Sequence, residues 1–423
     1  MKTILLSQRK ERDDLLAQKY IIRHTSVDMN ELLKSHLIKL ITGPRRVGKS
    51  TQALLMLKDC NFAYINFDKQ ELLDHWNAEL VMRLLDDVYP GYEYLLLDEV
   101  QNLPNWDVWV TELFRMGKNL IITGSNANML SSEMATVLTG KYLPIAMLPF
   151  SQSEFFEWHK LDTNNILPEQ QNEAKILKDD YLRLGGYPET VAARSLATSY
   201  LSTLFDSIIL KDVVKRHKIR NTEDISNLAL YLLSNFCNPL SANDIANALN
   251  IRSVNTTQKF MGYLQEPFLI YYLPRYNNKL KLMTKAPKKI YVVDNGFVAA
   301  KAFSTSENLG RLLENQVFVN LLRIGYNTER SMFYYHTRND KEIDFVLREN
   351  NRVKQLLQVS YDIASDKALR RECSALIEAA EELQCNELYV LTYNDTRTIN
   401  WAGHTIQAVS TSEWFKSFVY PTL

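Results

Sequence analysis

The chain has 423 residues, of which 46% are hydrophobic and 23% charged, a composition typical of a soluble globular protein. This length exceeds what one ordinary hydrophobic core holds, so we expect two or three domains. The 49 basic and 49 acidic residues give a formal net charge of zero, which argues against a protein coated in nucleic acid but not against a local basic patch.

Cysteine usage and hydropathy indicate a compartment. The four cysteines are scattered without a C-x-x-C pair, which favours reduced structural thiols and gives no metal site. The N-terminal apolar run is too short for a signal peptide, and no run reaches the roughly 18 apolar residues that a membrane span needs. We therefore expect a cytoplasmic protein with no membrane partner.

Patterning along the chain predicts an α/β protein with five successive regions. They are a charged helical lead-in at 1–35, a parallel-sheet core at 36–150, a helical region at 151–230, a winged helix at 231–303 and a second α/β domain at 304–423.

In the core region, short apolar runs alternate with helical patterns, which is typical of a parallel sheet covered by helices. The predicted strands are Leu37–Thr42, Phe62–Phe67, Tyr94–Leu97, Asn119–Thr123 and Tyr142–Leu148. In the following helical region, Phe155, Phe156 and Trp158 are candidates for an aromatic core, and the polar stretch Asp162–Glu173 is predicted to be a loop.

The last two regions carry different patterns. Ser241 is a predicted N-cap, and Asn250 a natural stop, for the first of two short helices. The elements expected for the winged helix are Ala242–Leu249, Ser253–Leu264, Phe268–Leu273 and Lys288–Val293. Those expected for the final domain are a helix at Leu309–Leu322 and strands at Met332–Tyr335, Glu342–Leu347 and Leu356–Tyr361.

The run Gly43–Ser50 fits the phosphate-binding pattern G-x-x-x-x-G-K-[ST] and stands between a predicted strand and an apolar-faced helix. Glycines allow the loop to wrap with its N–H groups toward phosphates, and the helix N-terminus adds partial positive charge. We expect Lys49 to reach the β- and γ-phosphates of ATP and Ser50 to bind Mg²⁺. The predicted nucleotide-binding residues are Gly43, Pro44, Arg45, Arg46, Val47, Gly48, Lys49, Ser50 and Thr51.

A second motif follows about fifty residues later, where an apolar strand ends in Asp98 and Glu99. Open α/β sheets bind nucleotides at the carboxyl ends of their strands, so we expect Asp98 to hold Mg²⁺ and Glu99 to polarise the attacking water. Ser125 or Asn126, after a third strand, is expected to contact the γ-phosphate or that water, with a polar turn as the alternative.

Several runs carry a family resemblance: Thr42–Thr51, Leu96–Gln101, Thr123–Asn126, Gly185–Glu189, Lys289–Gly296, Glu342–Phe345 and Gln358–Tyr361. Together they resemble a large family of prokaryotic AAA+ superfamily ATPases with a C-terminal domain of unknown function. The resemblance extends from about residue 20 to the C-terminus. It implies an AAA-like core, a winged-helix segment and a C-terminal domain similar to PD-(D/E)XK nucleases.

The family pattern also implies a basic residue that senses the nucleotide. Lys141 stands where the family usually has arginine, and a lysine lacks the bidentate fork of that side chain. Arg183 and Arg216 are other candidates, with a solvated surface arginine as the favoured alternative for each.

In the C-terminal domain, the resemblance matches Glu314, Asp344, Gln358 and Ser360 to nuclease site positions. Glutamine replaces an expected metal-binding acid and serine an expected lysine, so we predict an inactive nuclease-like fold. Glu314 and Asp344 then remain candidates for a buried polar cluster or a recognition site.

A basic stretch in or beside the predicted wing suggests a second partner. A phosphate backbone is one ligand for it, and a solvated hairpin is the alternative. The residues concerned are Lys279, Lys281, Lys285, Lys288 and Lys289, with Arg252, Asn255, Gln258 and Lys259 on the second helix.

The sequence therefore predicts an ATPase with ATP and Mg²⁺ as cofactors and an unknown macromolecular partner, protein or DNA. A DNA-acting ATPase and a slow nucleotide-dependent switch are the alternatives, and assembly into a homo-oligomer stays open.

Overall fold

The computed structural model describes residues 1–423 except 26–27, 131–139, 164, 304–307 and 419–423. The predicted regions 1–35, 36–150, 151–230 and 304–423 each include some residues outside this description. The chain forms two compact units, and the first comprises Met1–Phe150 with Glu266–Phe268. The second begins at Ser151 and contains most of the remaining chain.

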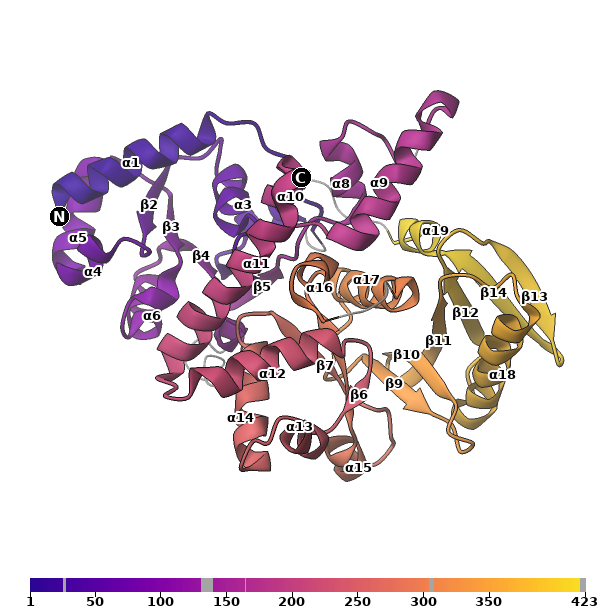
Figure 1. Cartoon of the computed structure of the whole chain (residues 1–423). Helices are drawn as coiled ribbons and strands as arrows, with labels where there is room; N and C mark the ends of the chain where they lie inside the picture. Colours follow the sequence, from indigo (N-terminus) through magenta and orange to yellow (C-terminus); the bar gives the residue numbers. More distant parts are fainter. Residues whose placement is uncertain (26–27, 131–139, 164, 304–307, 419–423) are drawn as a thin grey trace. The chain divides into compact units, whose positions relative to one another are not determined.

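The first unit is built on a five-stranded parallel sheet, as the sequence predicts (Figure 1). Its strand order, which the structure adds, is β2-β3-β4-β1-β5. All five residues of β1 are buried, which explains its continuous apolar run in a sheet covered on both faces. Because β4 lies between β3 and β1, the segments after these three strands meet at one edge of the sheet. The strands are β1 (Ile38–Thr42), β2 (Phe62–Asn66), β3 (Tyr94–Asp98), β4 (Asn119–Gly124) and β5 (Tyr142–Ala146).

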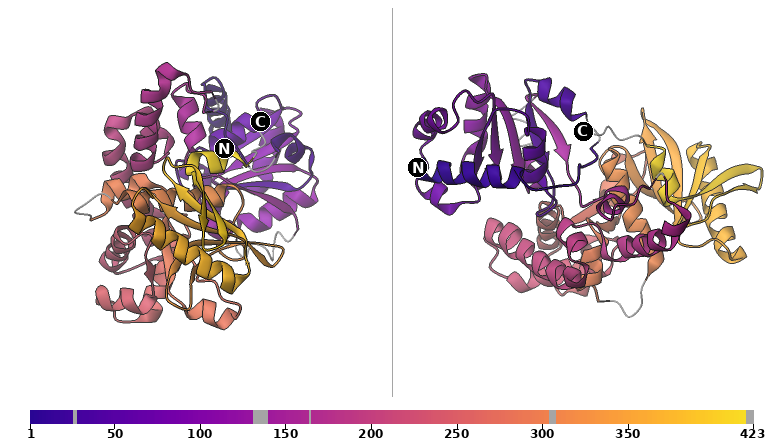
Figure 2. Two further views of the ribbon diagram at one scale, coloured as in Figure 1. Left: turned by 90° about the vertical axis from the view of Figure 1, so that its right-hand side faces the viewer. Right: turned by 90° about the horizontal axis from the view of Figure 1, so that it is seen from above.

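The helices of this unit pack around the sheet (Figures 1 and 2). The N-terminal helix α1 contacts β2, α3 and α5, so the predicted lead-in belongs to this unit. The helices are α1 (Lys2–Leu16), α2 (Met29–Lys34), α3 (Lys49–Met56), α4 (Gln70–Asp74), α5 (Ala78–Val88) and α6 (Trp106–Arg115), with 3-10 turns η1 (Val100–Asn102) and η2 (Ala127–Leu130).

The second unit begins with helices and a small antiparallel sheet of order β6-β8-β7. Ser241 caps α13 through a capping box with Asp244, and Asn250 has a left-handed φ of 54° just after the helix. The helices are α8 (Gln152–Trp158), α9 (Gln171–Leu184), α10 (Pro188–Ala192), α11 (Ala197–Ile208), α12 (Thr222–Ser234), α13 (Ala242–Ala248), α14 (Val254–Gln265), α15 (Leu280–Lys285) and α16 (Asn295–Lys301). The strands are β6 (Pro239–Leu240), β7 (Ile270–Leu273) and β8 (Lys288–Val292), and the short turns are η3 (Pro168–Gln170), η4 (Arg194–Leu196) and the π-helix η5 (Ile209–Lys215).

A mixed six-stranded sheet of order β13-β14-β12-β11-β10-β9 completes this unit (Figure 1). Helix α18 packs against β10, β11 and β12, and α17 contacts β11. The elements are α17 (Leu309–Arg323), β9 (Met332–His336), β10 (Glu342–Glu349), β11 (Arg352–Ser360), α18 (Asp366–Leu383), β12 (Glu387–Thr392), β13 (Arg397–Trp401), β14 (His404–Ser410) and α19 (Thr411–Lys416).

Two predictions for the helical region are wrong in part. Phe155 and Phe156 are buried, but Trp158 at the end of α8 is 39% exposed, because it lies off the buried face of that helix. The predicted loop 162–173 contains helical structure, since η3 begins at Pro168 and α9 at Gln171. Proline at the first helical position suits such a start.

Within the described residues, no helix combines the length and the apolar character that crossing a membrane requires.

Candidate nucleotide-binding site

The loop between β1 and α3 depends on two glycines. A Cβ on Gly43 would lie 2.0 Å from the carbonyl oxygen of Met147, so only glycine fits there. Gly48 has a φ of 92° and is the N-cap of α3. The loop therefore ends at a helix N-terminus whose N–H groups are available to an anion.

Lys49 is the first residue of α3, and its side chain is buried. Its ammonium donates to the carbonyl of Pro44 at 2.9 Å and lies 3.6 Å from the Glu99 carboxylate. The loop lysine and the acidic end of β3 are thus brought together, as the two motifs predict.

Asp98 is the last residue of β3 and is 3% exposed. The Ser50 hydroxyl donates to its Oδ1 at 2.7 Å, and the Tyr64 hydroxyl donates to its Oδ2 at 3.1 Å. Thr123, on the neighbouring strand β4, also donates to Oδ1. These contacts hold the carboxylate beside the serine that follows the loop lysine.

The environment of Asp98 raises the pKa of its carboxyl group. Burial raises the pKa of Asp98 to about 6, and the charge of Glu99 acts in the same direction. Hydrogen bonds from Thr123, Ser50 and Tyr64 favour the carboxylate and limit the rise. A nearby cation would favour the ionised form further.

Glu99 follows β3 with a left-handed φ of 50°, a conformation rare for a residue with a side chain. Its Oε2 accepts hydrogen bonds from Gln101 at 2.5 Å and from Ser125 at 3.1 Å. Its backbone N–H donates to the Thr123 hydroxyl at 2.9 Å. The carboxylate therefore has a fixed direction relative to β4, and local strain of this kind concentrates at functional sites.

The side chains around Glu99 favour its ionised form. Burial raises its pKa, but Lys49, Gln101, Arg45 and Ser125 together outweigh burial and place the pKa below its ordinary value. Glu99 is therefore an anion at neutral pH, in contact with the turn after β4.

The other predicted residues lie in or next to the same loop. Val47 is buried, Arg46 is exposed with a φ of 65°, and Thr51 is half-buried in α3. Asn126 lies in the turn after β4, where its carbonyl accepts from the N–H of Met129. The structure thus places Ser125 against Glu99, while a catalytic role for Asn126 stays a prediction.

Sequence analysis did not predict three side chains that hydrogen-bond to Asp98 or Glu99. They are Tyr64, Thr123 and Gln101. Tyr64 and Thr123 carry a weak signal, because each is a polar group among the mostly apolar residues of a strand next to β3. Gln101 has none, since its approach to Glu99 depends on the conformation of the turn.

The donor set suits a hard divalent cation. Ser50 and Asp98 present oxygen atoms 2.7 Å apart, and Mg²⁺ is typically held by one or two such groups with phosphate oxygens and water. Clusters of three or more histidine, cysteine or acidic residues with metal-site geometry are absent from the described residues. The two oxygen donors of Ser50 and Asp98 leave the remaining coordination positions of such a cation to phosphate oxygens and water.

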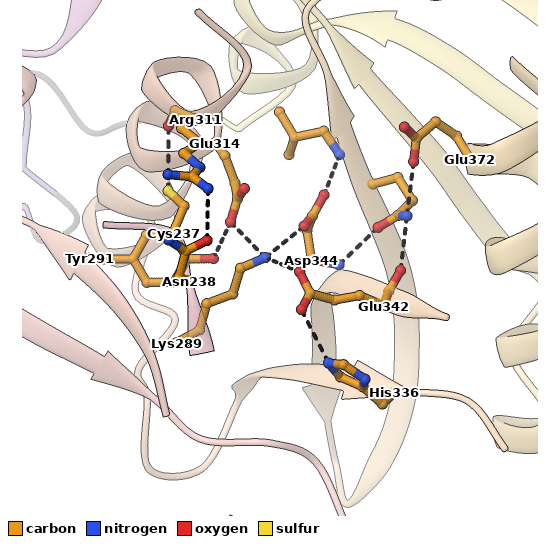
Figure 3. Close-up of polar contacts among 12 residues, drawn as sticks. Cys237, Asn238, Lys289, Tyr291, Arg311, Glu314, His336, Glu342, Asp344 and Glu372 are labelled. Carbon is orange, nitrogen blue, oxygen red and sulfur yellow. Dashed lines mark hydrogen bonds and ion pairs between the residues drawn. The ribbon is translucent and has the colours of Figure 1, made fainter. Parts of the chain in front are cut away.

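A separate polar cluster lies in the second unit around the buried Lys289 (Figure 3). The Lys289 ammonium lies 2.8 Å from Glu314, 2.7 Å from Glu342 and 2.7 Å from Asp344. Burial opposes its charge, but these carboxylates dominate and the pKa of Lys289 lies well above its ordinary value. The prediction that Lys289 belongs to a basic stretch open to a phosphate backbone is wrong, and so is the alternative of a solvated hairpin lysine, because its ammonium is enclosed by acids from α17 and β10.

The glutamine at the expected acid position is part of the same cluster. Gln358 accepts from the N–H of Asp344 at 2.8 Å and donates to the carbonyl of Glu342 and the carboxylate of Glu372 at 3.0 Å each. A cavity of about 480 Å³ adjoins these side chains. Ser360 bonds to the carbonyl of Asp362 instead.

The candidate sensor residues differ in environment. Lys141 and Arg183 are half-buried. The Arg216 guanidinium lies 3.8 Å from the buried Asp212 one helical turn earlier, and only 25% of its side chain is exposed. The reading of Arg216 as a solvated surface arginine is therefore wrong.

Three family models match successive parts of the chain. Residues 35–156 match the family model of an AAA domain, residues 177–308 a domain of unknown function (DUF8612) and residues 309–414 another (DUF4143). Among solved structures, the Walker-type ATPase of Pyrococcus abyssi is 15% identical with a TM-score of 0.44, covering 68% of this chain and 99% of that one. The replication initiator DnaA, solved with AMPPCP and single-stranded DNA, is 16% identical with a TM-score of 0.26, covering 56% and 86%.

Two relatives match over most of their length. An uncharacterized protein of Methanocaldococcus jannaschii is 31% identical over 409 residues, which cover 92% of this chain and 90% of that protein. An uncharacterized protein of Haemophilus influenzae is 31% identical over 344 residues, covering 77% and 83%. The chain therefore belongs to the same family as these two proteins, a family of prokaryotic AAA-like P-loop ATPases.

Proposed function

We propose that this protein binds ATP with Mg²⁺ at the carboxyl edge of its parallel sheet and hydrolyses it. The observation that carries the proposal is the 2.7 Å hydrogen bond between Ser50 and Asp98, which joins two motifs 48 residues apart. It brings the phosphate loop, a carboxylate and the adjoining Glu99 to one point, and this is the arrangement that phosphoryl transfer to water needs.

Each side chain has a separate task in this proposal. The N–H groups at the start of α3 bind phosphate oxygens, and the Lys49 ammonium neutralises charge on the β- and γ-phosphates. Ser50 and Asp98 would hold Mg²⁺, which supplies further neutralisation of phosphate charge. Glu99, kept ionised by its neighbours, orients a water molecule toward the γ-phosphorus.

The reaction then needs only water as co-reactant. The water oxygen forms a bond to the γ-phosphorus as the bond between that phosphorus and the bridging oxygen breaks. The electron pair leaves with ADP, and the proton of the water passes to Glu99 and on to solvent. Because little covalent chemistry falls to the protein, most of the catalysis comes from positioning and charge.

A direct test compares the wild type with Lys49→Ala for binding of ATP-Mg²⁺ and for phosphate release. Lys58→Ala is the matched control, since it removes an exposed lysine just after the same helix. We expect Lys49→Ala to lose ATP binding and Lys58→Ala to retain it. Equal binding by Lys49→Ala and the wild type contradicts the proposed site.

A second candidate function is engagement of a nucleic acid backbone, and the exposed face of α14 favours it. Asn255, Gln258 and Lys259 of α14 are exposed and lie three to four positions apart, so they share a helix face, and Arg252, just before the helix, is exposed as well. Four further lysines of the basic stretch are exposed as well, namely Lys279, Lys281, Lys285 and Lys288. With four phosphate contacts, the slope of log K against log salt is about −3.6.

Hydrolysis measured with and without duplex DNA tests this second function. Stimulation that is lost in a Lys259→Gln variant and falls with salt supports it. Turnover indifferent to DNA argues for a protein partner or a nucleotide-dependent switch instead.

A further inference from the structure

Arg23 is buried in the first unit, outside both nucleotide motifs and before the residues that match the AAA domain. Its guanidinium donates to the carbonyl of Val47 at 2.6 Å, to that of Leu148 at 2.6 Å and to that of Pro149 at 3.4 Å. It also lies 4.9 Å from the ring centroid of Phe150. These contacts join the guanidinium to backbone carbonyls of the phosphate loop and of the segment after β5.

The contact with Val47 bears directly on the phosphate loop. The peptide bond between Val47 and Gly48 is trans and planar, so the Val47 carbonyl and the Gly48 N–H point in opposite directions. The hydrogen bond from Arg23 holds the Val47 carbonyl on the side of the peptide that faces the guanidinium. The Gly48 N–H is thereby directed to the other side, where α3 begins and a phosphate would bind.

The second pair of contacts, to Leu148 and Pro149, joins the arginine to the segment after β5. The segment after β5 runs along the loop, since the Met147 N–H donates to the carbonyl of Thr42 at 2.7 Å. The same segment leaves no room for a Cβ on Gly43. Arg23 therefore ties the end of the phosphate loop to the strand extension that touches its beginning.

We propose that Arg23 is a positioning residue of the nucleotide site, which holds the Val47–Gly48 peptide in the orientation that binds the β-phosphate. This rests on the proposed function, because nucleotide is the ligand being positioned. An arginine suits the task, since its planar fork reaches two carbonyls at once, whereas a lysine offers a single point charge. The side chain acts through the loop and does not itself contact the reacting atoms.

The test uses Arg23→Met and Arg23→Lys, with Arg12→Met as the matched control. Arg12, in α1 of the same unit, likewise donates to a carbonyl, that of Phe62, and lies 4.8 Å from the Phe62 ring centroid. The readouts are the dissociation constant of ADP-Mg²⁺, hydrogen exchange of the amides of 43–50 in nucleotide-free protein, and the melting temperature.

We expect Arg23→Met to weaken ADP binding about tenfold or more, the effect of losing one charge-assisted hydrogen bond. Exchange at 43–50 should become faster, KM should rise more than kcat falls, and Arg23→Lys should restore part of both. Arg12→Met should leave ADP binding and loop exchange at wild-type values even where it lowers the melting temperature. If Arg23→Met does not fold, Arg23→Lys and its loop exchange decide the question.

Wild-type ADP affinity and unchanged loop exchange in a folded Arg23 variant would overturn the inference, as would equal weakening in Arg12→Met. Failure of the proposed function is distinguishable. A wild type that binds ADP without hydrolysing ATP removes the hydrolysis proposal and leaves the binding test intact. Loop exchange, measured without nucleotide, reports on Arg23 even in a protein that binds none.

Discussion

The ammonium of Lys289 in β8 lies 2.7 Å from the carboxylate of Asp344 in β10, and the two residues are 55 positions apart. Glu314 and Glu342 complete the acids around the same lysine. In a nuclease-like site such carboxylates would hold a metal ion, whereas here an internal ammonium lies among the three acids and offsets part of their charge. The cluster therefore connects the small antiparallel sheet to the six-stranded sheet within the second unit.

Replacing Lys289 by methionine should destabilise the second unit strongly. Removing one partner of a buried ion pair leaves uncompensated charge, which costs about 3–5 kcal/mol. The neighbouring Lys288→Met is the control, because Lys288 is exposed and surface changes usually stay within about 0.5 kcal/mol. Urea unfolding measures both variants, and equal midpoints would show that the cluster contributes no stability.

A methyl group at Gly185 should be far more harmful than one at Gly117. Both glycines have a φ of 75°, where alanine is strained, and the ψ of −162° at Gly185 adds a conformation that hardly any residue except glycine adopts. A Cβ on Gly185 would lie 1.7 Å from Asp294, while one on Gly117 meets nothing within 4 Å. We expect Gly117→Ala to cost about 1–2 kcal/mol and Gly185→Ala to lose soluble folded protein. Comparable melting temperatures for the two variants would contradict the close packing at Asp294.

The free energy of unfolding should depend on pH through the ionisation of Asp294. Burial raises the pKa of Asp294 to about 7, although its carboxylate accepts from the N–H groups of Gly186 and Gly296. Between the unfolded pKa of about 4 and this value, the folded state binds one more proton than the unfolded state. Its contribution to stability is thus present at low pH and is lost as the pH rises through about 7.

The measurement is the free energy of unfolding of the wild type and Asp294→Asn from pH 5 to pH 8. The wild type should lose stability relative to the variant by up to about 1.4 kcal/mol per pH unit below pH 7. Parallel curves would show that Asp294 titrates normally in the folded protein.

Much of the first unit could be predicted from the sequence, because buried parallel strands are continuous apolar runs. The start of β1 was expected at Leu37 and lies at Ile38, and its end at Thr42 was predicted correctly. The phosphate loop was equally readable, since its glycines and lysine occur at fixed spacing. The meeting of Ser50 with Asp98 follows once β4 is known to lie between β1 and β3.

Contacts between distant segments could not be predicted in this way. In the sequence, Lys289 is one of several neighbouring lysines. Only the fold brings Glu314 of α17 and Glu342 of β10 to its ammonium. Arg23 lies in a polar lead-in, and its hydrogen-bond acceptors are backbone carbonyls. Every residue has such a carbonyl, so the sequence gives no sign of which ones Arg23 contacts. Trp158 shows the opposite error, since an aromatic residue in a helical pattern need not face the core.

The most direct test of the central claim is ATP hydrolysis by Glu99→Gln beside the wild type and Glu93→Gln, an exposed glutamate just before β3. We expect Glu99→Gln to bind ATP-Mg²⁺ with nearly wild-type affinity and to hydrolyse it at least about 100-fold more slowly, since the water loses its orienting carboxylate. Glu93→Gln should hydrolyse at the wild-type rate. Wild-type turnover by Glu99→Gln would contradict the assignment of this residue, and a wild type without turnover would contradict the proposed hydrolysis itself.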